Sequence, residues 1–435
     1  MTANGTAGRT RSPALPGAAA APGAWRAVFG AIFASTWCGN QFSPLLLMYE
    51  QHQHYSTALV NMFLGVYVLG LAPTLLLAGA LSDRYGRRPL MCAGIVASLA
   101  AGGALAFGPL GPAPVFAGRL LSGVTVGVSM AVGNSWLKEL SQPPHDPAAD
   151  AGTGARRASL AFTLGSGCGA LVAGALAQWG PWPEVLPFLV QIAVAAPFTL
   201  LVARVPETGR GGLPGPLRAQ LRVPAAGHRR FVRVVAVAAP WLFASAALAY
   251  GYLPVLLRGA TGHWGLAYAT ALTGVTLGVA ALVQPWAKRL DSPDSAHGLV
   301  VSLVLTAAGL GLFTLAQWQR SPLLGVATAA VLGCGIGVGL VSGLMEVQRI
   351  AGPRDLAGLT GVFYALAYAG FLTPTVLASV TPPLRTTWLM LALCALAALS
   401  AATVRRRTGD HLPAHAHRPD RMLSRAAEPQ ESPAE

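Results

Sequence analysis

Long apolar segments separated by short polar stretches make up the pattern of this chain. A helix rises about 1.5 Å per residue, so an apolar segment of about 20 residues crosses the roughly 30 Å of hydrocarbon in a bilayer. The pattern therefore predicts an all-α integral membrane protein with twelve transmembrane helices. We expect them at about 25–48, 57–81, 89–108, 113–137, 158–178, 185–204, 231–257, 264–286, 298–317, 322–346, 357–380 and 385–404.

The polar stretches divide the chain into five predicted regions. The longest internal stretch, from Val205 to Arg230, has six spans on either side. We therefore expect an N-terminal six-helix half at 24–204, a cytoplasmic linker at 205–230 and a C-terminal six-helix half at 231–404. Residues 1–23 and 405–435 are polar or rich in Ala and Pro, and are expected to be a disordered arm and tail.

Basic residues lie almost entirely on one side of the predicted spans. Of the 30 Lys and Arg, only Arg258, Arg320 and Arg385 fall in the other set of loops, and Arg119 falls within a span. Short loops rich in Lys and Arg stay in the cytoplasm. We therefore expect a multi-pass plasma-membrane protein with both termini cytoplasmic. The net charge of +14 then reflects membrane topology, not nucleic-acid binding.

Composition and missing motifs exclude other classes. The chain is 53% hydrophobic and only 11% charged, against about 25% charged in soluble domains. The five cysteines lie in apolar runs and form no CxxC pair, so no metal site is expected. The chain contains no Walker loop, HExxH or GxSxG, which argues against an enzyme and against ATP-driven pumping. No cofactor is expected. The expected partners are a small-molecule substrate and the lipid bilayer, and the protein is expected to be a monomer.

The stretch GALSDRYGRRPL between spans 2 and 3 concentrates charge in a nearly charge-free region. The positive-inside rule explains its arginines but not Asp83 or the glycines. Gly79 lies one turn before Asp83, where it would let another helix approach closely. Gly86 would permit the tight reversal between the two spans.

This stretch resembles the loop 2–3 signature of the major facilitator superfamily, and the chain is most similar to its bacterial drug or metabolite:proton antiporters. In that family the aspartate latches the outward-facing state against the end of helix 11. By resemblance, Asp83 would contact the start of span 11 near Gly358 to Gly361. The implied latch residues are Gly79, Asp83, Arg84, Gly86, Arg87 and Arg88.

Other stretches support the resemblance. AGRLLSGVTVG resembles the span 4 signature with its intramembrane arginine, here Arg119, and VPET after span 6 resembles a sugar-porter motif. Acid–base pairs at the inner gate are expected between Glu139 and Arg156 or Arg157, and between Glu346 and Arg354. Two features depart from the pattern: Pro285 replaces the aspartate of the second loop signature, and span 5 lacks the Gly-Pro pair of drug antiporters.

Arg119 is a candidate coupling residue because a charge within a span is costly and usually functional. Its depth matches that of Asn40 and Gln41 in span 1, so we hypothesise that it hydrogen-bonds one of them. The alternative is that Arg119 extends to the outer surface. Glu346 is a weaker candidate for proton coupling, because an inner-gate salt bridge is the favoured explanation for it.

By analogy with the superfamily, spans 1, 4, 7 and 10 line a central cavity, and span 11 adds to it. The candidate lining is aromatic and nearly free of charge, which suits lipophilic or weakly polar molecules. For any single aromatic residue, ordinary packing is the competing explanation. The candidate cavity residues are Trp37, Asn40, Gln41, Asn134, Trp136, Trp241, Tyr250 and Tyr364.

These patterns predict a secondary active transporter that works by alternating access about a site near the middle of the membrane. Proton-coupled export is the leading interpretation. Uptake or uniport of a metabolite or sugar-like solute is the alternative, supported by VPET and by the missing proline of span 5. A polytopic membrane enzyme or receptor is a distant alternative, because no catalytic motif supports it.

Overall fold

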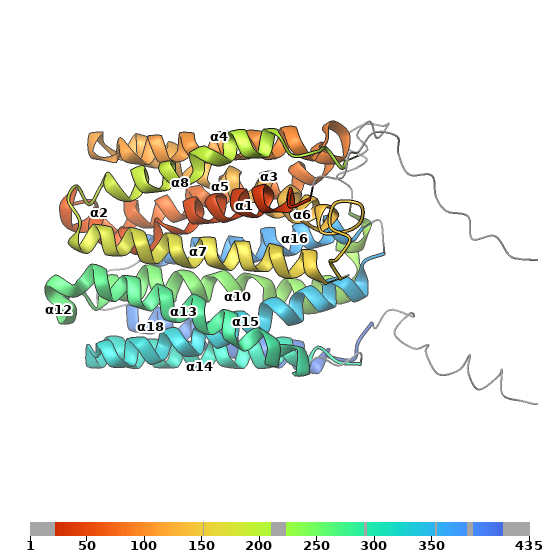
Figure 1. The fold of residues 1–435 in the computed structure, drawn as a ribbon. Coiled ribbons are helices and arrows are strands. Elements are labelled where there is room, and N and C mark those ends of the chain that lie inside the picture. Colours follow the sequence, from red (N-terminus) through yellow and green to blue (C-terminus); the bar gives the residue numbers. More distant parts are fainter. Residues whose placement is uncertain are drawn as a thin grey trace, which may run out of the picture.

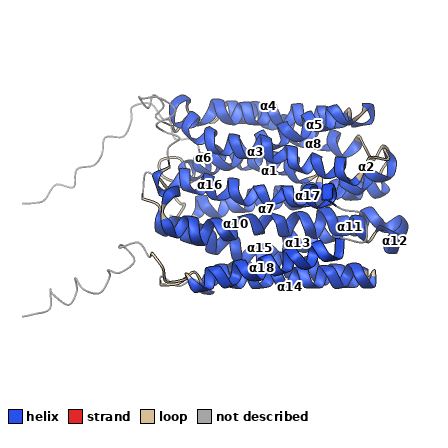
Figure 2. Ribbon diagram, turned by 180° about the vertical axis from the view of Figure 1, so that it is seen from behind, coloured by secondary structure: helices blue, strands red, loops and turns tan. Residues whose placement is uncertain are grey.

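A computed structural model describes residues 22–150, 152–209, 223–290, 294–352, 355–380 and 386–411, and its main elements are helices (Figures 1 and 2). The predicted arm before residue 22, most of the linker and the tail beyond residue 411 lie outside these ranges.

The first six spans agree closely with the predicted segments. Several consist of two helices joined by a short turn of a different helical type. They are α1 (Trp25–Asn40), η1 (Ser43–Leu45) and α2 (Leu46–His52); α3 (Thr57–Tyr85); α4 (Arg87–Ala106), followed by η2 (Gly108–Leu110); α5 (Pro112–Val128), η3 (Ser129–Gly133) and α6 (Asn134–Leu140); α7 (Thr153–Trp179); and α8 (Leu186–Ala203).

The last six spans follow the same plan. They are η4 (Pro224–Gly227), η5 (Phe231–Val235), α10 (Ala236–Ala246), η6 (Ala247–Tyr252) and α11 (Leu253–Leu256); α12 (Arg258–Thr261), η7 (Gly262–Trp264), α13 (Gly265–Ala287) and η8 (Lys288–Leu290); α14 (His297–Gln319); α15 (Pro322–Ile350); α16 (Leu356–Ala369), η9 (Gly370–Leu372) and α17 (Thr373–Val380); and α18 (Thr386–Arg406).

The predicted twelve spans are confirmed. Eleven helical segments of the described chain are long and apolar enough to cross a membrane. The remaining span is the first, in which the 16-residue α1 stops at Asn40. Pro44 explains this break, because a proline has no N–H to donate to the carbonyl four residues earlier and its ring clashes with that carbonyl.

Glycines bring helices together in corresponding places of the two groups of six spans. A Cβ on Gly123 would collide with the Tyr67 carbonyl oxygen, and a Cβ on Gly337 would collide with the Ala280 carbonyl oxygen. Span 4 therefore packs directly on the backbone of span 2, and span 10 packs on that of span 8. This correspondence is what an internal repeat predicts.

Two spans contain π-helical turns. The turn η3 interrupts span 4, whereas η5 and η6 lie in span 7, where η6 carries Tyr250 and Tyr252. Such turns widen a helix locally and are frequent at functional sites. All three turns occur in spans that the sequence assigns to a central cavity.

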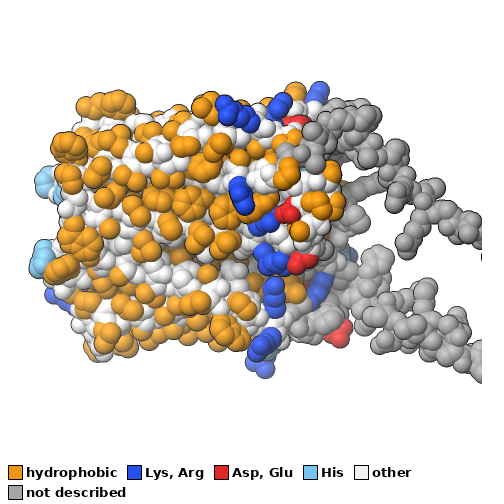
Figure 3. Space-filling view, in the orientation of Figure 1, with side chains coloured by type: hydrophobic (Ala, Val, Ile, Leu, Met, Phe, Trp, Pro, Cys, Tyr) orange, Lys and Arg blue, Asp and Glu red, His pale blue; other side chains and the backbone are white. Residues whose placement is uncertain are grey.

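The helices run side by side, and their two ends differ in charge (Figures 1 and 3). Lys, Arg, Asp and Glu gather at one end, whereas hydrophobic side chains cover the middle of the bundle. We call the end with Arg84, Arg88, Lys138, Lys288 and Arg405 the basic end, and the other end, with Glu50 and Arg258, the opposite end.

Contacts between the two groups of spans involve a few helices only. α7 packs against α13, and α3 packs against α16 and α17. The interface between the groups therefore runs through the centre of the bundle. The exact boundaries of the two halves stay predictions, because residues 210–222 lie outside the described ranges.

Candidate functional site

An aromatic cluster occupies the interface between the two groups of spans. Tyr67 of α3 faces the rings of Tyr368 and Phe371, with centroids 6.2 and 6.3 Å away. Phe243 of α10 stacks on the same two rings at 4.1 and 5.3 Å, and Tyr364 lies 6.5 Å from Tyr368. The sequence interpretation included Tyr364 of span 11. It missed Tyr67, because it did not count span 2 among the spans that line the cavity, and it missed Phe371 in span 11.

Arg119 points into the protein and is 1% exposed, so the alternative of an outward-extending side chain is wrong. Its Nε donates to the Phe63 carbonyl at 3.2 Å and its Nη1 to the Gly39 carbonyl at 3.1 Å. The guanidinium also lies over the rings of Phe42 and Tyr67, at 4.6 and 4.5 Å. Gly39 belongs to the last turn of α1, where free carbonyls favour a cation.

The expected hydrogen bond from Arg119 to Asn40 or Gln41 is wrong. The Asn40 side chain instead donates to the Thr36 carbonyl at 3.1 Å and to Ser166 at 3.0 Å. The early end of α1 exposes a backbone carbonyl, and that carbonyl replaces the amide side chains as the partner of the arginine.

Several buried polar atoms near α1 and η3 have no hydrogen-bond partner in the described part of the chain. They are both amide atoms of Gln41, Nε1 of Trp37, the hydroxyl of Ser129 and Oδ1 of Asn134. Buried polar groups are nearly always paired with protein or water. These atoms are therefore the ones available to water or to a bound molecule.

Two predicted cavity residues serve another purpose. Trp136 is fully buried at the basic end, where its Nε1 donates to the Pro206 carbonyl at 3.3 Å. Trp241 donates to the Ser400 hydroxyl of α18 at 3.2 Å. Both rings fix neighbouring segments by ordinary packing. Tyr250 is buried in the same hydrophobic core cluster as Tyr67.

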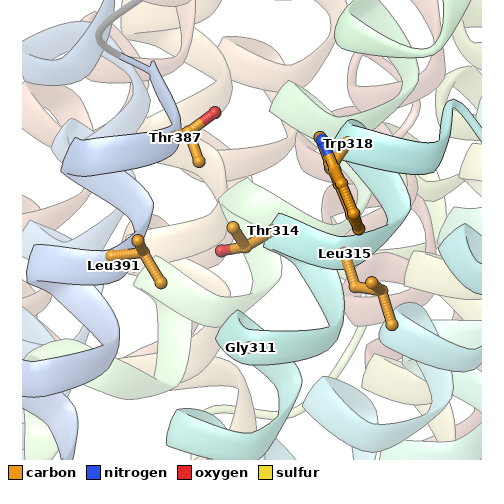
Figure 4. A pocket seen from close by; sticks show the side chains of 6 residues that line it. All are labelled: Gly311, Thr314, Leu315, Trp318, Thr387 and Leu391. Carbon is orange, nitrogen blue, oxygen red and sulfur yellow. The ribbon is translucent and has the colours of Figure 1, made fainter.

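A pocket of about 340 Å³ lies on the flank of the second group of spans, between α14 and α18 (Figure 4). None of the candidate cavity residues lines it. It is lined by Gly311, Thr314, Leu315, Trp318, Thr387 and Leu391.

Arg87 is the centre of a charge network at the basic end. Its Nη1 donates to Asp83 at 2.8 Å and its Nη2 donates to Glu139 at 3.1 Å. Glu207 accepts the backbone N–H groups of Arg87 and Arg88, at 2.8 and 2.9 Å, and so caps the first turn of α4. Thr208 donates to Glu139 and closes the network.

This network corrects several expectations about the loop. Among the described residues, Asp83 bonds to Arg87 and not to the start of α16. No described atom lies within 4 Å of a Cβ on Gly79, so no helix approaches there. Gly86 has φ +101°, which confirms its use in the reversal. The guanidinium of Arg84 lies 5.8 Å from the Tyr85 ring.

The expected pairs of Glu139 are wrong as well. Arg156 pairs with Asp150 at 3.0 Å and Arg157 with Asp146 at 2.7 Å, both in the loop before α7. The Arg156 hydrogen bond lowers the pKa of Asp150 to about 2. These loop acids satisfy the two arginines, so Glu139 is left to Arg87.

Glu346 has partners that the sequence interpretation did not identify. It accepts from Nε of Arg230 at 2.7 Å and from Arg349 at 2.8 Å. Arg230 is fully buried, and its Nη1 also donates to the carbonyls of Thr408 and Asp410 after α18. The predicted partner Arg354 lies outside the described residues.

The opposite end is closed by contacts between the two groups of spans. Gln178 of α7 donates to the His263 carbonyl at 3.0 Å and accepts from the Ala267 amide at 2.8 Å. Thr375 donates to the Asn61 carbonyl at 2.9 Å.

Glu50 adds an ion pair to this closure, because Arg258 lies 3.5 Å from its carboxylate.

A bundle of twelve spans, with a buried aromatic interface between two groups of helices and one end closed, is typical of a membrane transporter. Residues 27–374 match the model of the Major Facilitator Superfamily. The chain therefore belongs to this superfamily of transporters and is not an enzyme.

Two curated relatives are similar over part of the chain. The multidrug transporter AQR1 of Candida glabrata is 30% identical over 171 residues, 39% of this chain and 27% of that protein. The multidrug efflux pump LfrA of Mycolicibacterium smegmatis is 33% identical over 156 residues, 35% of this chain and 29% of that protein. The matched region thus spans less than a third of either relative.

Solved structures share the fold. A peptide transporter POT in complex with sulfate has a TM-score of 0.70 at 13% identity, covering 89% of this chain and 94% of that one. A D-xylose-proton symporter has a TM-score of 0.66 at 16% identity, covering 89% and 97%. These likenesses confirm the expected fold class.

Proposed function

We propose that this secondary transporter exports lipophilic or weakly polar molecules in exchange for protons. The aromatic cluster between the two groups of spans carries this proposal. Its rings offer large apolar faces with hydroxyl groups at their edges, and Arg119 lies beside Tyr67. In the ranges that the structure describes, the buried carboxylates are Glu50 and Glu346, near the two ends of the bundle. A centre without acids suits uncharged, apolar molecules better than polar metabolites.

The relatives support the same direction of transport. Both are named for multidrug transport or efflux, although the matched region is only part of each protein. By the positive-inside rule, the basic end faces the cytoplasm, so both termini are cytoplasmic. Export from the cell would place the protein in the plasma membrane.

Within this proposal, the network around Arg87 holds the basic end in one state of the cycle. Arg87 joins α4 to Asp83 on α3 and to Glu139 on α6, and Glu207 attaches the segment after α8 to the same site. All four elements belong to the first six spans, so the network holds that group together at its basic end as the two groups move. Asp83 acts as the latch through its ion pair with Arg87. Arg119, which donates to two backbone carbonyls, is the proposed coupling residue within the membrane.

Proton-coupled uptake is the second candidate. The VPET motif favours it, because Glu207 of this sugar-porter-like motif caps α4 in the structure. Uptake predicts that cells with the wild-type protein accumulate more of the transported compound, whereas export predicts that they accumulate less.

The test measures accumulation of dyes and antibiotics in an efflux-deficient bacterial host, with and without a protonophore. Export predicts lower accumulation with the wild type, abolished by the protonophore and by Asp83→Asn. Asp150→Asn is the matched control, because Asp150 is an exposed acid at the same end, outside the network. Higher accumulation that depends on the proton gradient would establish uptake. Unchanged accumulation across the panel would overturn export of this class of molecule.

A further inference from the structure

A crevice of about 410 Å³ lies between α7 and α13 near the basic end. Its walls come from different groups of spans. α7 contributes Arg156, Ser159, Leu160 and Thr163, and the other wall carries Gln284 and Lys288. Neither the aromatic cluster nor the network around Arg87 includes any of these residues.

The chemistry of the crevice changes with depth in the membrane. Arg156 is in the first turn of α7 and Lys288 directly follows α13, so both cations lie at the mouth. Thr163 is seven residues further along α7, which is about 10 Å deeper at 1.5 Å per residue. The spacing of 156, 159, 160 and 163 puts these side chains on one helix face. A charged mouth thus leads to a wall of hydroxyl and apolar groups.

The charge of the mouth is only partly compensated. Arg156 pairs with Asp150, but both side chains are about two-thirds exposed, so the pair is weak. Lys288 makes no ion pair within the described ranges. By contrast, Arg87, Arg157 and Arg230 at this end each have a carboxylate partner. The crevice therefore retains an excess of positive charge.

The crevice is continuous with the surface that faces lipid. Leu160, which lines the crevice, is 51% exposed, and Leu164, one turn further along the same face of α7, is 42% exposed. In a bilayer these apolar side chains contact acyl chains. A molecule with an anionic head and an apolar tail fits this combination of mouth and flank, whereas free phosphate would use the mouth alone.

We propose that this crevice binds an anionic phospholipid, with its phosphate between Arg156 and Lys288 and an acyl chain along Leu160 and Leu164. Basic pockets between transmembrane helices are known to hold such headgroups. Gln284 and Ser159 provide hydrogen bonds to the glycerol region. Because the two cations belong to different groups of spans, the bound lipid favours the arrangement in which α7 and α13 stand at this spacing.

Native mass spectrometry of the delipidated full chain, titrated with phosphatidylglycerol or phosphatidylcholine, tests the proposal. We expect tighter binding of phosphatidylglycerol. Arg156→Gln with Lys288→Gln should lower that affinity roughly 30-fold, since each basic residue near an anionic lipid contributes roughly fivefold. Both residues are exposed, so the variant should keep its melting temperature.

Two further variants keep the test specific. Arg405→Gln with Arg406→Gln removes two exposed cations from α18 at the same end and should leave lipid affinity unchanged. Ser159→Leu fills the crevice but keeps its charge and should also weaken binding of phosphatidylglycerol. Equal binding of the two lipids by the wild type, or an equal loss in the α18 variant, would overturn the proposal. Full displacement of the lipid by millimolar inorganic phosphate would show an anion site without lipid specificity, which also overturns it.

Discussion

At the scale of single residues, buried charges decide the architecture, and each uses a different partner. Arg119 is held by two backbone carbonyls and two aromatic rings, whereas Arg230 is held by a carboxylate and two backbone carbonyls. The sequence predicted that Arg119 turns inward, since a charge in an apolar span avoids lipid. It did not predict the partner, because the free carbonyl of Gly39 exists only where Pro44 interrupts the span.

Replacing Arg119 by alanine should lower stability markedly. The carbonyls of Phe63 and Gly39 would lose their donor, and an unsatisfied buried polar group costs about 1–3 kcal/mol. Thermal unfolding in detergent measures this loss. Arg119→Lys should recover only part of it, because an ammonium cannot lie flat between the rings of Phe42 and Tyr67. Full stability of both variants would contradict the observed contacts.

Glu346→Gln should be more damaging than Arg349→Gln. Removing one partner of a buried ion pair costs about 3–5 kcal/mol, because Arg230 would keep an uncompensated charge. Arg349 is partly exposed, so its loss is screened by solvent. The double variant Arg230→Gln with Glu346→Gln should lose less than the sum of the single variants. A strictly additive result in the same unfolding assay would argue against the pair.

At the scale of elements, hydrophobic length was sufficient to predict the spans, because hydrocarbon thickness sets it directly. Pairing between loops was not predictable in the same way. The resemblance to the inner gate of the superfamily favoured Arg156 and Arg157 as partners of Glu139. Asp150 and Asp146 lie closer to those arginines along the chain and pair with them instead. The VPET motif is visible in the sequence, but its role as a helix cap is not. That role depends on the fold, which brings the Glu207 carboxylate to the first turn of α4, 119 residues earlier in the chain.

Glu207→Ala should loosen the first turn of α4. Its carboxylate accepts two N–H groups that have no partner within the helix, and loss of such a cap costs about 1 kcal/mol. Hydrogen exchange should therefore quicken at the amides of Arg87 and Arg88. Amides in the middle of α4 serve as the internal control, because the cap does not reach them. If the exchange rates at Arg87 and Arg88 do not change either, Glu207 does not cap the helix.

At the scale of the whole molecule, the structure is closed at the opposite end and has a crevice at the basic end. Alternating access requires the closure to open. The closing contacts between Gln178 and the His263 segment, and between Thr375 and Asn61, are hydrogen bonds to backbone groups. The sequence could not reveal these closing contacts, because every residue has a backbone carbonyl and nearly every residue has a backbone N–H, so no side-chain pattern marks the partner.

The anchoring of Arg230 also sets an order on biosynthesis. Arg230 leaves the ribosome 116 residues before Glu346 and 178 residues before Thr408. During that interval it is a cation at the start of span 7 without its final partners, held near the membrane surface. The second group of helices therefore reaches its final packing only after its last helix has been inserted.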